Sequence, residues 1–304
     1  MLDIIGVGDA NVDVMISVPY LPSHDEKVRG KLIGYYPGGI TANFCSAAAA
    51  FGAKVGAVCK LGDDSYGHLS MEDLRGRGVD VSHMAVDSSC ETYFCMIQLD
   101  GTGEKALTIV ETSGFVPKRE DIDLGYLRTA RRVHMTTLDP ELVAYVAEGL
   151  EGSGVRLSLD IEATAGKCPP ETWARVLPHV DTAFPNEAGL AALTGERSPS
   201  AGARQLLARG VGTVVVTCGA EGARIFTHTE QLSVPAFQVA VKDTTGAGDC
   251  FNAVFLCGLT RGWGRRKAAQ YAAAAAAISI GAVGARTALP DEAYVKQFLA
   301  ERGV

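Results

Sequence analysis

The sequence predicts an α/β protein with a mostly parallel central sheet flanked by helices and a small β-sheet lid. Two observations lead to this class. Short apolar strand patterns alternate with helical stretches along most of the 304 residues, which is typical of parallel sheets. Two further segments interrupt this alternation with residues that favour β-strands. No Pro- or Ser-rich linker divides the chain, so we expect one domain covering residues 1–304.

The chain opens with a β-α-β pattern. Asp3–Gly8 is a short apolar strand that ends in glycine, Ala42–Phe51 is a helix of small residues, and Lys54–Val58 is the next strand. Strand and helix patterns then continue to alternate toward the C-terminus. We expect strands at Arg132–Thr136, Val155–Asp160, Thr182–Phe184 and Thr213–Thr217, and helices at Asp64–Arg77, Pro140–Leu150 and Ala201–Arg209.

The two interrupting segments are Val12–Tyr36 and Glu91–Val110. Both are rich in alternating β-formers, and the second contains a Gly-Thr-Gly turn. We interpret them as strands of one small sheet that projects from the main body as a lid, built from about residues 12–36 and 91–110. Because the alternation gives each segment an apolar face that a monomer would leave partly exposed, we expect a homodimer through the lid.

The composition excludes several kinds of partner. Lys and Arg number 28 against 35 Asp and Glu, a net charge of −7, and there is no basic stripe of the kind that binds nucleic acid. The chain enters its first strand without a leader pattern, which predicts a cytoplasmic protein. The apolar run Tyr271–Val283 is shorter than the roughly 20 residues that cross a bilayer. We therefore expect a buried core helix there and no membrane contact.

The eight cysteines are scattered along the chain. No pair has the two-residue gap of a zinc or redox motif. We expect most of them to be small buried hydrophobic residues.

The segment with the clearest chemistry is Asp243–Ala253, a glycine-rich turn that enters a helix. The first amides of a helix lack partners within it and favour an anion such as phosphate. Asp249 lies in the first turn, where a carboxylate would repel a phosphate that only had to be bound. A base beside a phosphate suits an incoming hydroxyl that loses its proton as it attacks. The alternative is that Asp249 only complements the helix dipole.

Four other features indicate ligand binding. Asn11 and Asp13 are two residues apart, so on a strand both face the same way and can grip adjacent hydroxyls; the alternative is turn capping. The pair Gly38-Gly39 precedes a helix and lets the backbone approach a ligand closely, although a simple loop-to-helix junction has the same pattern. The Thr-x-Gly that begins at Thr217 suits an edge-on nucleotide contact or a strand-ending turn. Asp160 ends a strand and could reach phosphates through Mg²⁺.

Asp243–Ala253 resembles the signature D-T-x-G-A-G-D-x-F of the ribokinase-like, or PfkB, carbohydrate kinase family. The resemblance extends over essentially the whole chain. The other matching segments are Gly8–Asp13, Pro37–Asn43, Ala47–Ala50, Gly52-Ala53, Leu61–Gly67, Pro185–Glu187 and Thr217–Gly222, in the family's order.

The resemblance implies a Rossmann-like sheet, a lid that closes on a sugar-like substrate, and transfer of the γ-phosphate of ATP to a hydroxyl with Mg²⁺. Asp249 is then the general base. The implied anion hole is formed by the amides of Gly246, Ala247 and Gly248, the substrate site by Asn11, Asp13, Gly39 and Asn43, and the nucleotide site by Asn186, Thr217, Gly219 and Gly222. A monovalent cation such as K⁺ is implied at Asp243, Thr245, Ser279, Ala282 and Gly284.

The chain departs from the family at two places. The motif Asn-x-x-Glu is Asn186-Glu187-Ala188-Gly189 here, so its final Glu is absent; Glu187 either substitutes through a water or is a solvated residue at the start of a helix. Ribokinases proper carry a Lys where this chain has Ile40 and an acid in the region that reads Val133–Leu138 here, so we expect a substrate other than ribose.

Two other functions compete with a sugar kinase. A nucleoside kinase of the same fold would stack a base on lid aromatics, and the candidates are Tyr35, Tyr36, Tyr93 and Phe94. A non-catalytic ligand-binding protein on the same scaffold is the second. An intact Asp249 argues against the second.

Overall fold

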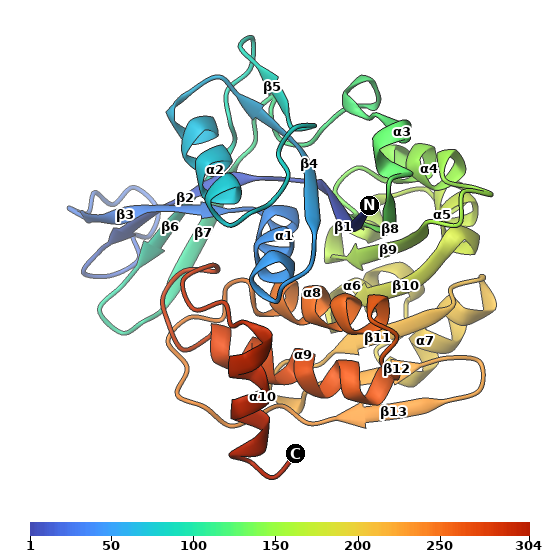
Figure 1. Ribbon diagram of the computed structural model, residues 1–304. Coiled ribbons are helices and arrows are strands. Elements are labelled where there is room, and N and C mark those ends of the chain that lie inside the picture. The colour runs from blue at the N-terminus through green and yellow to red at the C-terminus, as the bar shows by residue number, and fades with distance from the viewer.

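A computed structural model describes all residues, 1–304. Its centre is a nine-stranded sheet in the order β13-β12-β11-β10-β9-β8-β1-β4-β5 (Figure 1). The strands are, in that order, Gln231–Val234, Ala223–Phe226, Thr213–Thr217, Val180–Pro185, Arg156–Ile161, Ala130–Thr136, Leu2–Gly8, Val55–Gly62 and Ala85–Asp87. The expected mostly parallel central sheet is therefore confirmed.

The strands from β5 to β11 pair in parallel, and only the β11-β12-β13 edge is antiparallel. Every residue of β4 is buried, as expected for a central parallel strand covered on both faces. In β13, exposed and buried residues alternate, which is typical of an edge strand. The two antiparallel strands were not anticipated, because the expected pattern was strand alternating with helix.

Helices cover both faces of the sheet and enclose two hydrophobic clusters of 37 and 33 buried residues. The first cluster includes residues of α1 (Ile40–Ala50), α2 (Ser65–Gly76), α8 (Ala247–Thr260), α9 (Arg265–Ser279) and α10 (Glu292–Ala300). The second includes residues of α3 (Leu124–Leu127), α4 (Pro140–Gly149), α5 (Pro170–Val176), α6 (Glu187–Thr194) and α7 (Pro199–Ala208). Short 3₁₀ helices occur at Arg119–Asp121, Ala163–Lys167, Leu177–His179 and Gly219–Glu221.

The Ala-rich run near the C-terminus is a core helix, as expected. Eight of the fifteen residues of α9 are buried, and the helix ends at Ser279, before the predicted end of the run. None of the helices combines the length and the apolar character that a membrane span needs. Seven of the eight cysteines are buried and all are free, which agrees with their expected role as small hydrophobic residues.

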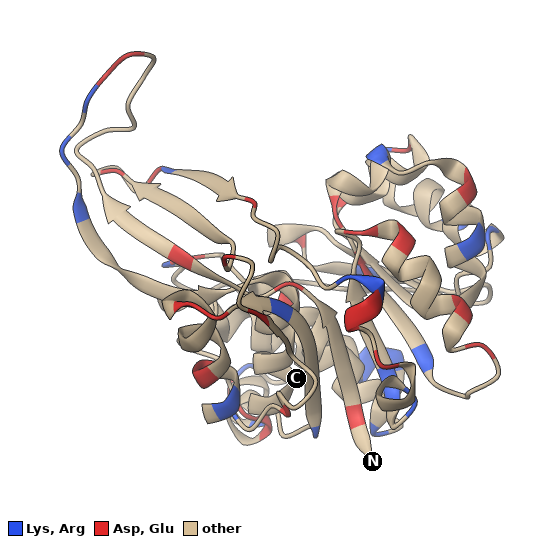
Figure 2. Cartoon of the chain, turned by 90° about the horizontal axis from the view of Figure 1, so that it is seen from above, with Lys and Arg blue, Asp and Glu red and all other residues tan.

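A separate four-stranded sheet has the order β3-β2-β6-β7. Its strands are Lys31–Gly38, Asn11–Ser17, Phe94–Leu99 and Lys105–Val110. The two interrupting segments of the sequence contribute two strands each and, as expected, join in one small sheet that projects from the side of the body (Figures 1 and 2). Figure 2 also shows Lys and Arg scattered among Asp and Glu along the chain.

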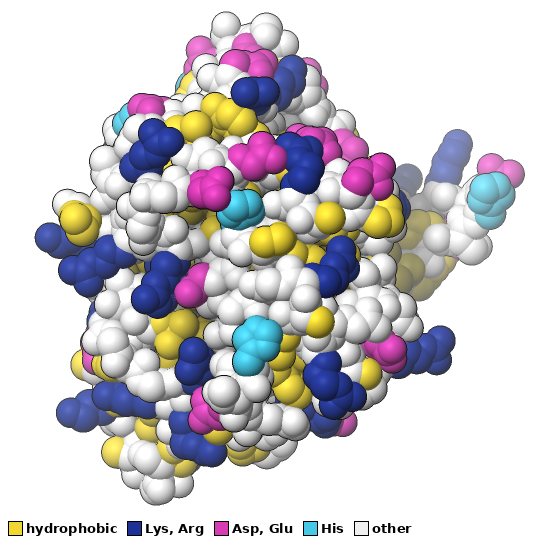
Figure 3. Space-filling model, turned by 90° about the vertical axis from the view of Figure 1, so that its right-hand side faces the viewer, with side chains coloured by type: hydrophobic (Ala, Val, Ile, Leu, Met, Phe, Trp, Pro, Cys, Tyr) yellow, Lys and Arg dark blue, Asp and Glu magenta, His cyan; other side chains and the backbone are white.

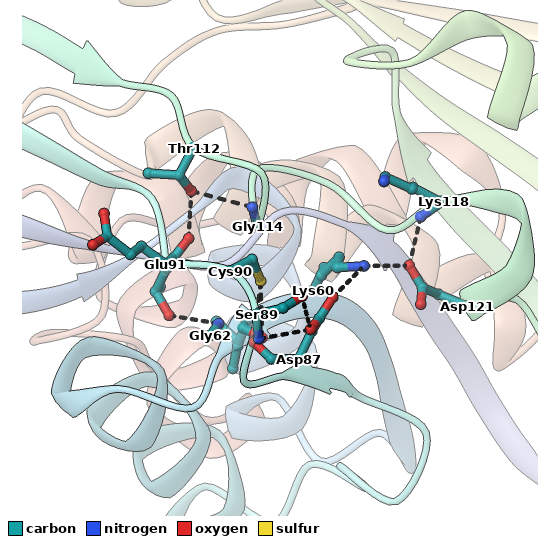
Figure 4. Close-up of polar contacts among 12 residues, drawn as sticks. Lys60, Gly62, Asp87, Ser89, Cys90, Glu91, Thr112, Gly114, Lys118 and Asp121 are labelled. Carbon is teal, nitrogen blue, oxygen red and sulfur yellow. Dashed lines mark hydrogen bonds and ion pairs between the residues drawn. The ribbon is translucent and has the colours of Figure 1, made fainter.

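The small sheet is fastened to the body by polar contacts at its root, which Figure 4 shows. The ammonium of Lys60, on β4, lies 3.3 Å from a carboxylate oxygen of Asp87 and 3.3 Å from one of Asp121. The amide of Gly62 donates to the hydroxyl of Thr92 at 2.8 Å. These contacts hold both chain segments that enter or leave β6 and β7, so the root of the sheet has a defined position on the body.

Candidate functional site

The N-terminus of α8 forms the centre of the site, at the edge where the parallel strands of the main sheet end. Its N-cap, Gly246, has φ 77°, and a Cβ there would lie 2.6 Å from the Cβ of Ala285, so this tight turn requires glycine. The amide of Ala247 donates to the carbonyl of Thr244 at 3.2 Å. The turn itself therefore already uses one of the three amides predicted for an anion hole. Gly248 is exposed, with open space where a Cβ would be.

Asp249 lies on the first turn of α8 and accepts a hydrogen bond from Nδ2 of Asn43 at 2.9 Å. Burial raises the pKa of Asp249 to about 7; the Asn43 hydrogen bond opposes this shift, and the negative charges of Asp9 and Glu162 add to it. A carboxyl that titrates near neutral pH is suited to exchange a proton with a substrate hydroxyl. The carboxylate predicted as a base thus has both a fixed orientation and a suitable pKa.

A buried arginine fixes the orientation of this pair. Nε of Arg286 donates to Oδ1 of Asn43 at 2.8 Å, and its Nη1 donates to Asp73 at 2.7 Å. Its Nη2 donates to the carbonyl of Gly38. Because the guanidinium occupies the amide oxygen of Asn43, the amide nitrogen must face Asp249. Arg286, which is 4% exposed, therefore positions the candidate base through Asn43.

Sequence reasoning missed Arg286, because its loop was considered only for a cation site. A signal was present: Arg286 is the only charged residue between Lys267 and Asp291. A lone charge in a long stretch of small and apolar residues needs buried partners.

The predicted substrate residues of β2 lie together. Nδ2 of Asn11 donates to Asp13 at 3.1 Å and to the sulfur of Cys95 at 3.2 Å. Oδ1 of Asn11 is buried and has no partner. Since buried polar atoms are almost always paired, this oxygen is a place for a donor such as a ligand hydroxyl. Burial is the main cause that raises the pKa of Asp13 above its ordinary value.

The two glycines before α1 allow a close approach of backbone and side chains. A Cβ on Gly38 would lie 2.5 Å from Oδ1 of Asn11, and one on Gly39, where φ is 97°, would lie 2.7 Å from Cα of Ala10. Any side chain at Gly38 would fill the space beside the unpaired oxygen of Asn11. The turn thus keeps the substrate site open.

Asp9, which sequence reasoning did not single out, organises this turn. Its carboxylate is 2% exposed and accepts from the amides of Ile40 and Thr41 at 3.0 Å each, at the start of α1. It also accepts from the hydroxyl of Tyr93 at 2.5 Å. Asp9 therefore joins the small sheet to α1 as well as capping the helix.

Three of the four aromatic residues considered for stacking a base are already engaged. Tyr93 is 3% exposed and bound to Asp9. Tyr35 and Phe94 pack on Tyr66 of α2, with ring centroids 5.9 and 5.7 Å apart. Only Tyr36 remains near the site, beside Gly284. This arrangement favours packing over base recognition.

A cavity of about 670 Å³ opens beside the N-terminus of α8. Ligand pockets are commonly about 300–1,000 Å³. Its walls include all four predicted nucleotide residues and two residues of the predicted anion hole. These are Asn186, Thr217, Gly219, Gly222, Ala247 and Gly248. Phe237, Val239 and Phe251 contribute apolar wall, so the cavity combines a surface for a base with amides for phosphates.

Asn186 lies at the start of α6, beside an acidic group. Its Oδ1 accepts from the amide of Gly189 at 2.7 Å, and its Nδ2 lies 3.3 and 3.4 Å from the two carboxylate oxygens of Glu162. Asp160, two residues before Glu162, accepts from Asn252 at 3.1 Å, and burial raises the pKa of Asp160 well above its ordinary value. Sequence reasoning missed Glu162, which belongs to no motif, and Asn252, which lies in the segment 243–253 but was given no role.

The segments predicted to hold a monovalent cation are brought together. Asp243 accepts from the amide and hydroxyl of Thr245 at 3.0 and 2.7 Å and from the amide of Gly284 at 3.0 Å. The hydroxyl of Ser279 donates within its own helix. From β7 of the small sheet, Nζ of Lys105 lies 3.1 Å from the hydroxyl of Thr245 and 3.5 Å from Asp243. The small sheet thus touches the loop that leads into α8.

Comparisons with known proteins agree with this arrangement. Residues 1–292 match the model of the pfkB family carbohydrate kinases. The chain is 30% identical over 302 residues to an ATP-dependent ribose-1-phosphate kinase of Halopiger xanaduensis, covering 99% of both chains. It is 33% identical over 275 residues to a 2-dehydro-3-deoxygluconokinase of Thermoproteus tenax, covering 86% of this chain and 84% of that one.

A solved structure has the same fold. The ribokinase of Arabidopsis thaliana, complexed with ribose and ATP, superposes with a TM-score of 0.87 at 27% identity, covering 98% of both chains. The family match spans nearly the whole chain, and the relatives are sugar kinases that match it from end to end. The chain therefore belongs to the pfkB family of carbohydrate kinases.

Proposed function

We propose that this enzyme moves the γ-phosphate of ATP to a hydroxyl of a sugar or sugar derivative, with Asp249 as general base. One observation carries this proposal: Asp249 directly follows Ala247 and Gly248, which line the 670 Å³ cavity, and it is linked through Asn43 and Arg286 to Gly38, which lies beside Asn11 and Asp13. An acceptor on one side and a triphosphate on the other would both reach this carboxylate. The sugar kinases among the relatives support the same reaction class.

The residues divide the work in the following way. The unpaired oxygen of Asn11 and the carboxylate of Asp13 accept from substrate hydroxyls and orient them. Asn43 holds Asp249 toward the reacting hydroxyl. Asp249 takes the proton late, as the new P–O bond forms, because an ordinary carboxylate is far too weak a base to hold a free alkoxide. The free amides at the start of α8 take up charge on the transferring group.

Mg²⁺ fits the oxygen groups next to Asn186, a residue of the cavity wall. Glu162, Asn186 and Asp160 offer the oxygen ligands that Mg²⁺ prefers. Mg²⁺ usually takes one or two carboxylates, keeps several waters and receives its other ligands from substrate phosphates. When bound, Mg²⁺ neutralises charge on the β- and γ-phosphates.

We further propose a monovalent-cation site at the loop that leads into α8. The backbone of residues 243–245 and 279–284 would provide it, since these two segments are tied together by Asp243. Replacing KCl by choline chloride at constant ionic strength is then expected to lower kcat. Equal rates in the two salts would argue against the site.

The small sheet supports a proposed homodimer. Leu107 and Ile109 on β7 are each 50% exposed. In register they face Ile97 and Cys95, and Cys95 in turn faces Asp13 on β2. Residues paired in register share a face of a sheet. The substrate-facing side of the sheet therefore continues into exposed apolar surface, which a second copy would cover.

Other surfaces of the molecule differ from this one. Figure 3 shows the right-hand side of Figure 1, where charged side chains are interspersed with small apolar areas.

We propose that the whole chain acts as one kinase domain with the small sheet as its lid. Its free cysteines are consistent with a reducing compartment, the cytoplasm.

ADP release with ATP and Mg²⁺ tests the proposed reaction. The acceptor panel contains sugars, sugar phosphates, sugar acids and nucleosides, and the Asp249→Asn variant is the control for contaminating activity. We expect turnover with a sugar or sugar derivative other than ribose, because Ile40 and Val133–Leu138 lack the groups that ribokinases use. Turnover with nucleosides alone would overturn the proposed acceptor class, and no turnover with any acceptor would overturn the reaction.

A further inference from the structure

One position at the nucleotide site has no room for a side chain. Gly189 occupies the position of the final Glu of the family's Asn-x-x-Glu motif. A Cβ on Gly189 would lie 1.9 Å from the carbonyl oxygen of Ile161, the last residue of β9. A glutamate could enter only if β9 and α6 moved apart. The missing carboxylate is therefore excluded by the local packing.

The residue that follows β9 has a carboxylate of its own. Glu162 directly follows β9, and its two carboxylate oxygens lie 3.4 and 3.3 Å from Nδ2 of Asn186, the first residue of the same motif. Glu162 is half-buried and forms no ion pair with Lys or Arg. Next to burial, its charge is among the causes that raise the pKa of Asp160 and of Asp249. The carboxylate thus lies on the reacting side of α6.

A carboxylate in this place needs a cation. The triphosphate of a nucleotide in the neighbouring cavity is strongly negative, and at close range an uncompensated Glu would repel it. A divalent ion between the two reverses the sign of the interaction. Mg²⁺ takes one or two carboxylates, keeps several waters, and receives its other ligands from phosphates. Glu162 has the charge, the position and the free oxygens for this task.

We propose that Glu162 is the acid that holds the magnesium ion of Mg·ATP, directly or through a coordinated water, in place of a side chain at position 189. Asn186 positions it by the amide contact. The inference rests on the proposed function, since it assumes that the cavity binds a nucleotide with its metal. Gly189 and Glu162 then compensate for one another. Because position 189 has no side chain, the end of β9 can pack closely against α6, and Glu162, the residue that follows β9, supplies the carboxylate.

Glu187 is the competing acid. It opens α6, is exposed, lines the nucleotide cavity, and forms no hydrogen bond or ion pair through its side chain. At this first-turn position a carboxylate complements the helix dipole and needs no other role. Experiment can distinguish the roles of Glu162 and Glu187, because replacing either by Gln removes the negative charge and keeps the size of the side chain.

The test measures metal binding and not turnover. Wild type, Glu162→Gln, Glu187→Gln and a remote control, Glu171→Gln, are titrated with Mn²⁺ and followed by electron paramagnetic resonance in the presence of a non-hydrolysable β,γ-imido analogue of ATP. Calorimetry gives the affinity for the same analogue without metal. We expect Glu162→Gln to weaken Mn²⁺ binding by about 10- to 100-fold, the range found for groups that support a metal site. Without metal, its affinity for the analogue stays equal or rises, because a negative charge near the phosphates is gone.

The controls and the contrary outcomes are distinct. Glu187→Gln and Glu171→Gln are expected to bind Mn²⁺ within about twofold of wild type, which is a free-energy difference of less than half a kcal/mol. The proposal is overturned if Glu162→Gln binds Mn²⁺ as tightly as wild type, or if Glu187→Gln carries the loss. It is also overturned if the variant loses analogue affinity equally with and without metal, since Glu162 would then only orient Asn186.

Folding and the proposed function are checked separately. Glu162→Asp keeps the charge and is expected to recover part of the Mn²⁺ affinity, and thermal melting of each variant shows whether it is folded. Turnover of the wild type with the acceptor panel tests the reaction itself. If the wild type phosphorylates a sugar while Glu162→Gln retains normal metal binding, the proposed role of Glu162 is refuted and the proposed function stands.

Discussion

Single residues at this site act mainly by orienting one another. Arg286 binds Asn43, Asn43 binds Asp249, and each contact leaves the next group one possible orientation. On the other side, Asp9 holds the turn that keeps Gly38 beside Asn11. The chemistry proposed for Asp249 therefore depends on the residues that fix its orientation.

Asp249→Asn and Asp13→Ala are expected to fail in different ways. Asp249→Asn keeps the size and removes the base, so kcat is expected to fall by at least about 10²- to 10⁴-fold. Sugar and nucleotide still bind, because the amides of α8 belong to the backbone. Asp13→Ala removes partners of substrate hydroxyls and acts mainly through the Michaelis constant. Steady-state kinetics with calorimetric binding distinguishes the two, and near-normal turnover of Asp249→Asn would show that the base is another group.

The pH dependence follows from the pKa of Asp249, which burial raises to about 7. Only the ionised carboxylate accepts a proton, so activity is present above this pKa and is lost as the pH falls through it. We expect kcat/KM, which reports the free enzyme, to fall about tenfold per pH unit below about 7. Rates measured from pH 5 to 9 check this, and a profile that is flat between pH 5 and 7 would contradict it.

Arg286 provides a test of positioning. Its positive charge lowers the pKa of Asp249 against the effect of burial. In Arg286→Gln we expect a lower kcat and a midpoint of the kcat/KM profile at higher pH than in wild type. A residue that only stabilises the fold would lower the amount of active enzyme without moving the midpoint. Arg204→Gln, at an exposed position on α7, is the control.

At the scale of secondary-structure elements, the small sheet depends on its root and its tip. Lys60 on β4 ties the root to the body, and Lys105 on β7 touches the loop before α8. The side chain of Lys60 is 6% exposed, whereas that of Lys105 is 43% exposed. The contact at the root is therefore the more buried of the two, and the contact at the tip is the more exposed.

Lys60→Met keeps the apolar stem and removes the charge between Asp87 and Asp121. We expect the free energy of unfolding to fall by about 1–3 kcal/mol, because Asp121, whose side chain is only 16% exposed, loses a charged hydrogen-bond donor. Urea unfolding measures this. Adding Asp121→Asn is expected to restore part of the loss, since it removes the unpaired charge. An equal loss in Lys296→Met, an exposed control on α10, would refute the explanation.

At the scale of the whole molecule, the carboxylate proposed as the base, Asp249, lies in the first turn of α8. The parallel strands of the main sheet end at one edge, and the small sheet stands over this edge. The same face of the small sheet carries Asp13 and the exposed Leu107 and Ile109. Substrate binding and the proposed association of two copies therefore share one element.

Replacing Leu107 and Ile109 by Glu places charges on the proposed contact face and is expected to give monomers. Light scattering at micromolar concentration compares this variant with wild type and with Tyr294→Glu, a control on α10 at an exposed tyrosine. We expect wild type and the control to be dimers. A wild type that is monomeric and fully active under these conditions would exclude the dimer.

The sequence by itself determined the order of the elements and the reaction class. Alternating strand and helix patterns led to the parallel sheet, because periodicity depends on near neighbours and on which face is buried. The glycine turn and Asp249 formed a recognisable motif for the same reason: their chemistry is contained in eleven consecutive residues, 243–253. The two antiparallel edge strands were missed, since β12 and β13 are only four residues each.

Only the tertiary structure decided which distant residues meet. Asn43 and Asp249 are 206 positions apart, and Asn43 and Arg286 are 243 apart. No local pattern links such residues, because their contact depends on how α1, α8 and the last loop pack. The exchange of Gly189 for Glu162 has the same origin: the close approach of β9 to α6 excludes one side chain and brings another. The sequence indicated the reaction class, and the packing determines which residues orient the proposed base.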